Sequence, residues 1–279
     1  MRSSRHTAFW ILACFALSLA VSPPASAGSI DLDSLLDLSS FVDEVDNPFF
    51  PLKPGTTFFY QGTSDGSPIT NEFAVTFDTK QILGVTTTVV HDRSFEDGQL
   101  AEDTFDWFAQ DAAGHVWYFG EDTTTLDPDT GQPVSTVGSW EAGVNGAQPG
   151  IIMEAHPHVG DLYQQEVALG VAQDSARVLS LDQFACVSFG CFDHLLLTEE
   201  QTPLHPGELE WKYYAKDVGF ILGNLVQGGN EHTELVSVDV VPEPSSFMLL
   251  AFGLLCFAVR RRPGAIPIFT FSRKVLVIA

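Results

Sequence analysis

The pattern of hydrophobic and polar positions changes at Asn47. From there to Val240, short runs rich in Thr, Val, Phe, Tyr and Trp recur between clusters of Gly, Pro, Asp and Asn. Such runs are typical of β-strands, and no helical pattern of useful length separates them. We therefore predict an all-β fold, an antiparallel sandwich or partly open barrel, in one domain over residues 47–240. The predicted strands are residues 56–60, 73–78, 85–91, 105–110, 115–119, 162–169, 177–181, 192–199, 209–214 and 233–240.

The clearest local unit is an aromatic hairpin. Residues 105–110 and 115–119 carry aromatic side chains at both odd and even positions and flank a turn at residues 111–114. Strands with large side chains on both faces are covered on both sides, or are covered on one side and open to a ligand on the other. The first interpretation predicts a buried core. The second makes Trp107 and Trp117 the walls of a pocket.

The N-terminal end has the pattern of an export signal. Arg2 and Arg5 precede an apolar run over residues 8–21, and the small residues Ala25, Ser26 and Ala27 follow. This order predicts a secretory signal peptide over residues 1–27, removed by signal peptidase. Residues 28–46 then form an acidic lead-in. Within it, the spacing of leucines over residues 31–44 predicts a short amphipathic helix or a flexible segment.

The C-terminal end has three parts in order. A proline-rich peptide comes first, an apolar stretch over residues 247–259 comes second, and an arginine cluster comes third. Flanking prolines disfavour helix and sheet, which leaves an accessible peptide beside the bilayer, while the arginines orient the apolar segment with its far side cytoplasmic. The pattern predicts one transmembrane segment, with an ordinary tail anchor as the alternative. The residues of the two flanking parts are Val241, Pro242, Glu243 and Pro244, and Arg260, Arg261 and Arg262.

This three-part arrangement resembles the PEP-CTERM sorting signal of Gram-negative bacteria, with Pro242, Glu243 and Pro244 as its signature. The resemblance implies recognition by an exosortase and cleavage near these residues. It also implies transient anchoring in the inner membrane, followed by delivery to the cell surface or the extracellular matrix. Residues 241–263 form the sorting signal. Residues 264–279 are an atypical tail, because such signals normally stop soon after the arginines.

Charge is distributed unevenly along the chain. All 36 Asp and Glu residues lie between Asp31 and Glu243, where the basic residues number six, so this span has a net charge of −30 (six minus 36). A body this acidic repels phosphate backbones and anionic lipid, which excludes nucleic-acid binding and peripheral membrane binding. It attracts metal cations, so calcium or another divalent cation is a candidate ligand, although no cofactor is indicated firmly.

Two of the four cysteines lie in the exported body. Cys186 and Cys191 are five positions apart, whereas Cys14 and Cys256 fall in the two terminal signals. An even pair in an oxidising compartment predicts a disulfide, with a pair of free thiols as the alternative.

One short segment has metal-like spacing. Alternate residues of an extended chain share a face, so His156 and His158 can coordinate one ion, with Glu154 on the same side and Asp161 nearby. Exposed loop histidines are the alternative. If the ion is present, the protein is a secreted metal-dependent hydrolase.

Several body segments also resemble an uncharacterised family of exported bacterial proteins. The resemblance is carried by residues 47–56, 106–122, 140–143, 148–151, 197–200, 203–204 and 212–215. It implies no activity. Our preferred hypothesis is an exosortase-processed surface or matrix protein, more a non-catalytic binding or structural domain than an enzyme, with exopolysaccharide as one candidate partner. The alternatives are the metal-dependent hydrolase and a carrier of an apolar ligand.

Overall fold

A computed structural model of the chain describes residues 36–242. These residues form a 16-stranded sheet in which every pair of neighbouring strands is antiparallel, and the described part contains no helix. The predicted all-β, antiparallel class is therefore confirmed. The strands are β1 (Phe41–Val42), β2 (Thr56–Ser64), β3 (Ser67–Ile82), β4 (Val85–Glu96), β5 (Gln99–Asp111), β6 (Val116–Leu126), β7 (Pro133–Ser135), β8 (Trp140–Glu141), β9 (Gln148–Met153), β10 (Leu162–Gln164), β11 (Glu166–Val167), β12 (Ser175–Val187), β13 (Gly190–Gln201), β14 (Leu209–Ala215), β15 (Gly219–Gln227) and β16 (Glu231–Val240).

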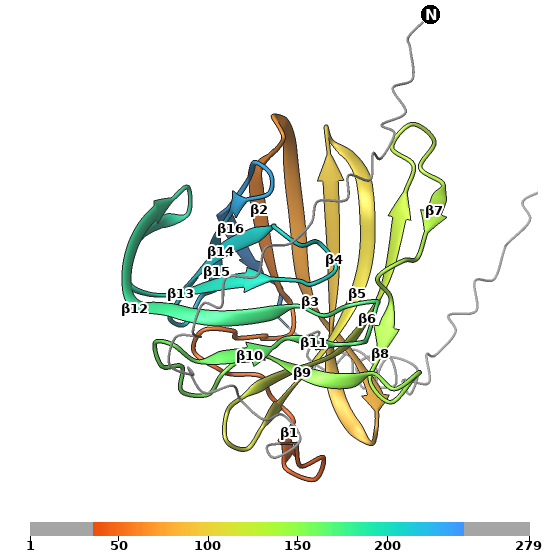
Figure 1. The fold of residues 1–279 in the computed structure, drawn as a ribbon, viewed down its shortest axis with the longest axis vertical. Helices are drawn as coiled ribbons and strands as arrows, with labels where there is room; N and C mark the ends of the chain where they lie inside the picture. The colour runs from red at the N-terminus through yellow and green to blue at the C-terminus, as the bar shows by residue number, and fades with distance from the viewer. Residues whose placement is uncertain (1–35, 243–279) are drawn as a thin grey trace, which may run out of the picture.

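The sheet curls into a nearly closed barrel (Figure 1). One short stretch of chain brings the two edges of the sheet together. Within it β10 pairs with β12, while β11, which begins after a single intervening residue, pairs with β9. Gln165 lies between them and donates its backbone N–H to the carbonyl of Asp174 at 2.8 Å. The crossing is tight, since a Cβ on Gly150 would lie 2.3 Å from the carbonyl oxygen of Gln165. The order of strands around the barrel is β10, β12, β13, β14, β15, β16, β2, β3, β4, β5, β6, β9 and β11.

The predicted strands all coincide with observed ones, apart from end residues and a split in residues 162–169. That segment breaks into β10 and β11 at Gln165, where the chain changes partner. The pattern missed β9 and β15, because Pro149 and Gly150 interrupt the first and Gly219, Gly223 and Asn224 interrupt the second. It also missed the short strands β1, β7 and β8.

The aromatic hairpin is buried on both sides, as the first interpretation predicts. Trp117 and Phe119 are fully buried, and Phe41 packs edge-on against both rings, with centroid distances of 6.2 and 5.4 Å. Asp111 organises the turn, because its Oδ1 accepts the backbone N–H groups of residues 113 and 115 and its Oδ2 accepts Nε1–H of Trp117 at 2.9 Å.

The described part of the acidic lead-in does not form the amphipathic helix that was one of its two expected conformations. Residues 36–44 form turns and the short strand β1 instead of an amphipathic helix, because Phe41 and Val42 pair with Asp111 and Gln110 at the end of β5. Strand pairing and burial of Phe41 thus override the leucine spacing. Residues 31–35 lie outside the described part.

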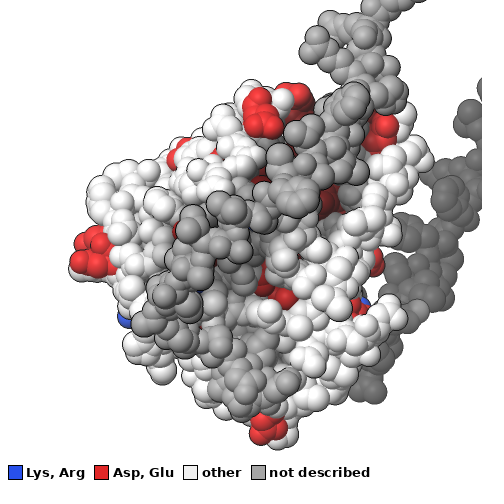
Figure 2. Space-filling model, in the orientation of Figure 1, with Lys and Arg blue, Asp and Glu red and all other residues white. Residues whose placement is uncertain are grey.

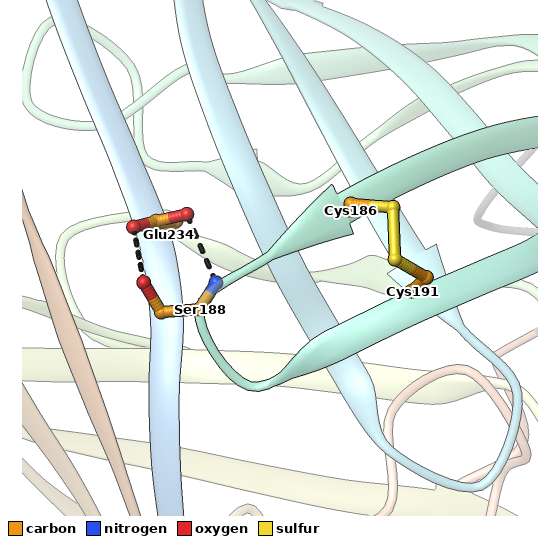
Figure 3. Close-up of a disulfide and its surroundings, with 4 residues drawn as sticks. All are labelled: Cys186, Ser188, Cys191 and Glu234. Atoms are coloured by element: carbon orange, nitrogen blue, oxygen red, sulfur yellow. Dashed lines mark hydrogen bonds between the residues drawn. A yellow bond between two sulfur atoms is a disulfide. The ribbon is translucent and has the colours of Figure 1, made fainter.

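The β12–β13 hairpin bends back over the sheet (Figure 3). In the structure Cys186 and Cys191 are bonded near its tip, with their Cα atoms 4.0 Å apart. Ser188 donates its N–H and its hydroxyl to the Glu234 carboxylate at 3.2 and 2.7 Å, and the N–H of Phe189 binds the carbonyl of Leu235 at 3.0 Å. Since β16 is three strands away from β13 in the sheet order, the hairpin crosses β14 and β15 to reach it.

Candidate functional site

Strand register places polar side chains inside one half of the barrel. Because side chains alternate between the two faces of a strand, residues paired across neighbouring strands point to the same side. Three rows on β2 to β6 point inward by this rule. The first row is Tyr60, Asn71, Ser94, Glu102 and Thr125; the second is Phe58, Phe73, Asp92, Thr104 and Thr123; the third, which begins on β3, is Val75, Val90, Asp106 and Glu121.

These rows border a cavity of 610 Å³. Its volume lies in the range of about 300–1,000 Å³ that is usual for small-molecule sites. Aromatic rings from both sides of the barrel line it, including Phe58, Tyr60 and Phe73 on one side and Tyr214 and Phe220 on the other. The lining of the cavity therefore consists of aromatic rings with carboxylates between them.

Two aspartates from adjacent strands face the cavity. Asp92 on β4 accepts a hydrogen bond from the Asn71 amide, and burial raises the pKa of its carboxyl to about 6. Asp106 on β5 is 6% exposed and its Oδ1 accepts the hydroxyl of Tyr118 at 2.6 Å. Burial, and then the charge of Asp92, raises the pKa of Asp106 well above its usual value. Both carboxyls hold protons more tightly than exposed ones because their charged forms are poorly solvated.

Further carboxylates continue the acidic lining into an adjoining hollow of 330 Å³. Glu121 and Glu166 line it together with Glu200 and Glu210. Burial raises the pKa of Glu121 to about 9 and that of Glu166 to about 7, and the neighbouring carboxylates add to the shift in both. On the face drawn in Figure 2, Asp and Glu are visible at several places while Lys and Arg are scarce. The lining of the barrel interior is therefore acidic, as is this face of the surface.

Lys212 is the one basic side chain among the described residues that line the larger cavity. Its Nζ lies 2.8 Å from Oε2 of Glu200 and 3.4 Å from Oε2 of Glu210. Burial lowers the pKa of Lys212, but the two carboxylates outweigh it and hold the pKa well above its usual value. The charge of Lys212 is therefore already matched, whereas no described basic group forms an ion pair with Asp92 or Asp106.

The four residues of the metal hypothesis do not form a common site. Glu154 is 3% exposed, and burial followed by the charge of Asp161 raises its pKa to about 7. His156 and His158 are exposed, and Nδ1 of His158 lies 3.4 Å from Oδ2 of Asp161. Within residues 36–242, no group of three or more His, Cys, Asp or Glu side chains is arranged to hold a metal ion.

The two tryptophans of the pocket hypothesis lie elsewhere. Trp107 and Trp117 are both buried and neither lines the 610 Å³ cavity, although Trp107 lines a separate hollow of 380 Å³. The residues that do line it, above all Asp92, Glu102, Asp106 and Lys212, were not singled out in the sequence. Their one signal is that polar residues are concentrated in residues 102–106 and 121–125, beside apolar segments of the same strands. That composition shows neither which side chains share a face nor what the face encloses.

The C-terminal end of the barrel domain leads into a recognisable motif. Residues 240–262 match the model described as the PEP-CTERM protein-sorting motif. The chain carries a PEP-CTERM sorting motif. The motif implies an exported protein that is processed by an exosortase, as the resemblance predicted. Most of the motif, including Glu243, Pro244 and the three arginines, lies outside the described residues, as do the predicted signal peptide and transmembrane segment. No helix within residues 36–242 is long and apolar enough to cross a membrane.

Two solved structures are weakly similar to this chain. One is a protein from Bacteroides fragilis, named as exported and as having a YmcC-like fold, with 12% identity, a TM-score of 0.40, and 68% of this chain and 98% of the other covered. The second, from Parabacteroides distasonis and named as a lipoprotein, has 9% identity, a TM-score of 0.36, and 69% and 99% coverage. Similarities this weak support no conclusion about function. No curated protein matches the chain.

The PEP-CTERM motif leads to a prediction about processing. We expect the mature protein to begin at Gly28 and to lack everything from Phe247 onward, because a signal-peptide pattern and a sorting motif flank the barrel. Intact-mass spectrometry of the protein from the cell-surface fraction measures both ends. Detection of residues 247–279 on the surface form would rule out exosortase cleavage. The same measurement in cells lacking the exosortase is the control and should show the unprocessed C-terminus.

Proposed function

We propose that this chain is a non-catalytic binding protein, delivered to the cell surface or matrix by its PEP-CTERM signal, whose barrel takes a small ligand in the 610 Å³ cavity. The cavity is the observation that carries the proposal. Its volume suits a small organic molecule, its rings offer apolar contact, and its carboxylates offer fixed hydrogen-bond acceptors. A binding role accounts for this combination of rings and carboxylates without any covalent chemistry.

Two glycines flank Thr233 on the inner face of the barrel. Thr233 on β16 faces the cavity, and its register partners are Gly62 on β2 and Gly223 on β15. Glycine has no side chain to occupy the interior at either position. A bulky residue at position 233 would therefore extend into the cavity, where the Glu210 carboxylate and the Phe220 ring already lie close to Gly223.

The hydrolase alternative has less support. It needs a metal held by Glu154, His156, His158 and Asp161, of which His158 and Asp161 are the pair in contact. The apolar-carrier alternative shares the cavity with our proposal but does not account for the carboxylates in its lining.

The proposal predicts that filling the cavity abolishes ligand binding. A fragment set containing cationic, neutral and anionic members is presented to the exported protein, and binders are detected by saturation-transfer NMR. We expect T233W to lose binding of the hits by about 10-fold or more, since the indole displaces the ligand from its contacts.

The matched control is T79W, which places the same ring on an exposed position of β3. It should bind the hits as the unaltered protein does. Circular dichroism of both variants establishes that the barrel is folded. Hits that bind T233W and T79W equally well would show that the cavity is not the site, and the proposed function would then be wrong.

A further inference from the structure

We infer that the ligand of this cavity is an organic cation, an amine or quaternary ammonium group attached to an apolar body. The inference rests on the proposed function, because it names the chemical class that the same cavity takes. It is carried by three features of the lining: its charge balance, its aromatic rings, and the arrangement of Asp92 and Asp106 within it.

The charge of the lining favours a cation over a neutral or anionic ligand. The acidic residues that line the 610 Å³ cavity have Lys212 as their one described basic counterpart, and Lys212 is already paired with Glu200 and Glu210. An anion would enter a space surrounded by carboxylates and pay a Coulomb penalty. A cation would instead neutralise charge that the described residues leave unmatched. The acidic lining residues are Asp92, Glu96, Glu102, Asp106, Glu210 and Glu231.

Asp106 shows where the positive group would lie. It is 6% exposed, its Oδ1 is occupied by the Tyr118 hydroxyl, and its Oδ2 accepts no hydrogen bond from a described residue. Asp92 lies on the same face of the neighbouring strand, two positions along the register. This oxygen is therefore open to a hydrogen-bond donor or a positive group that a ligand or water brings into the cavity. One ammonium group between the two aspartates would supply the missing donor or charge.

The aromatic lining matches the rest of such a ligand. Phe73 is the register partner of Asp92, and Phe58 pairs with Phe73 on the next strand, so rings stand directly beside the carboxylate. Ring faces attract ammonium groups and offer apolar contact to the attached body. A bare metal ion fits less well, because within the described residues no three ligating side chains converge.

Protonation of Asp92 gives the inference a pH signature. A cation binds the ionised form of this carboxyl, and burial raises its pKa to about 6, whereas the pKa of Asp106 is raised well above its usual value, so Asp106 holds its proton more tightly. Affinity should therefore fall as the pH drops through that value, since the protonated groups carry no charge. A neutral ligand would not show this loss. The groups that act on Asp92 are Tyr60, His91, Asn71, Glu102 and Asp106, and those that act on Asp106 are Asp92, Glu102, Tyr118, Glu121 and Glu166.

The test compares two probes of the same shape. Benzyltrimethylammonium and its neutral isostere neopentylbenzene are titrated into the exported protein by calorimetry, at about pH 8 and about pH 5 and at one ionic strength. We expect the cation to bind at least about 10-fold more tightly than the isostere at about pH 8, and D92N to weaken its binding by about 10-fold. D106N should have a smaller effect, because Asp106 holds its proton more tightly than Asp92. D193N removes one exposed charge outside the cavity and should leave the affinity unchanged. Calcium chloride is titrated as a third probe.

The outcomes separate the inference from the proposed function. Equal binding of both probes, lost in T233W, would overturn the cation class and leave the cavity as a binding site. Cation binding that persists in T233W would place the cation outside the cavity and overturn the inference. Cation binding that is the same at both pH values and in D92N and D106N would do the same. Calcium that competes with the cation would identify a metal site instead. If neither probe binds, the inference is wrong, and the fragment screen decides the proposed function independently.

Discussion

Replacement of Trp117 by alanine should lower the free energy of unfolding by about 3–5 kcal/mol, the usual cost of removing a fully buried large aromatic side chain. Trp117 has no exposed surface, and its ring packs edge-on against Phe41 of β1. Its removal leaves a cavity and also leaves Oδ2 of Asp111 without the indole N–H that it accepts at 2.9 Å. Both effects act on the folded state and have the same sign. Urea denaturation followed by fluorescence and circular dichroism measures the loss.

Two further variants separate these contributions. W117F keeps most of the ring volume but removes the hydrogen bond to Asp111, so it should cost less than W117A, about 1–3 kcal/mol. W211A truncates a partly exposed tryptophan on β14 and should cost about 1 kcal/mol. A W117A protein as stable as W211A would contradict the assignment of the aromatic hairpin as the centre of the core.

Stability should decrease as the pH rises from mildly acidic to alkaline values. Burial raises the pKa of Glu121 from 4.5 to about 9, with Asp106 adding to the shift. Between these two values the folded protein retains a proton that the unfolded chain has released, so raising the pH favours unfolding. Asp92, at about 6, and Glu166, at about 7, act with the same sign over the lower part of this range.

We expect the free energy of unfolding to fall by on the order of 3 kcal/mol between about pH 5 and about pH 9. E121Q carries a permanently neutral side chain, so it should lose part of this dependence and be more stable than the unaltered protein near pH 9. E44Q, at an exposed position, is the control and should keep the full dependence. Urea titrations across the pH range measure the effect. Stability that rises from pH 5 to pH 8 would contradict the buried, protonated state of these carboxyls.

Local pattern was sufficient for much of the fold. Alternation and β-branched composition located strands such as residues 56–60 and 85–91, because those preferences act within a few residues. The turn at residues 111–114 was also predictable, since Asp111 accepts hydrogen bonds from the N–H groups just after it. The sorting motif is local in the same sense: a proline-flanked glutamate, an apolar stretch and arginines are recognised as a linear peptide, so the matched residues 240–262 could be read directly.

Long-range pairing decided the rest. Whether the sheet became a sandwich or a barrel depended on the pairing of β16 with β2, from opposite ends of the domain, and on β10 and β11 joining the two edges of the sheet. Nothing within residues 162–167 specifies that these short strands pair with different edges. The candidate site has the same origin. Asp92 and Asp106 are ordinary strand residues until register sets them on one face and curvature encloses that face. Burial then raises the pKa of both carboxyls, an effect of solvent exclusion that exists only in the closed barrel.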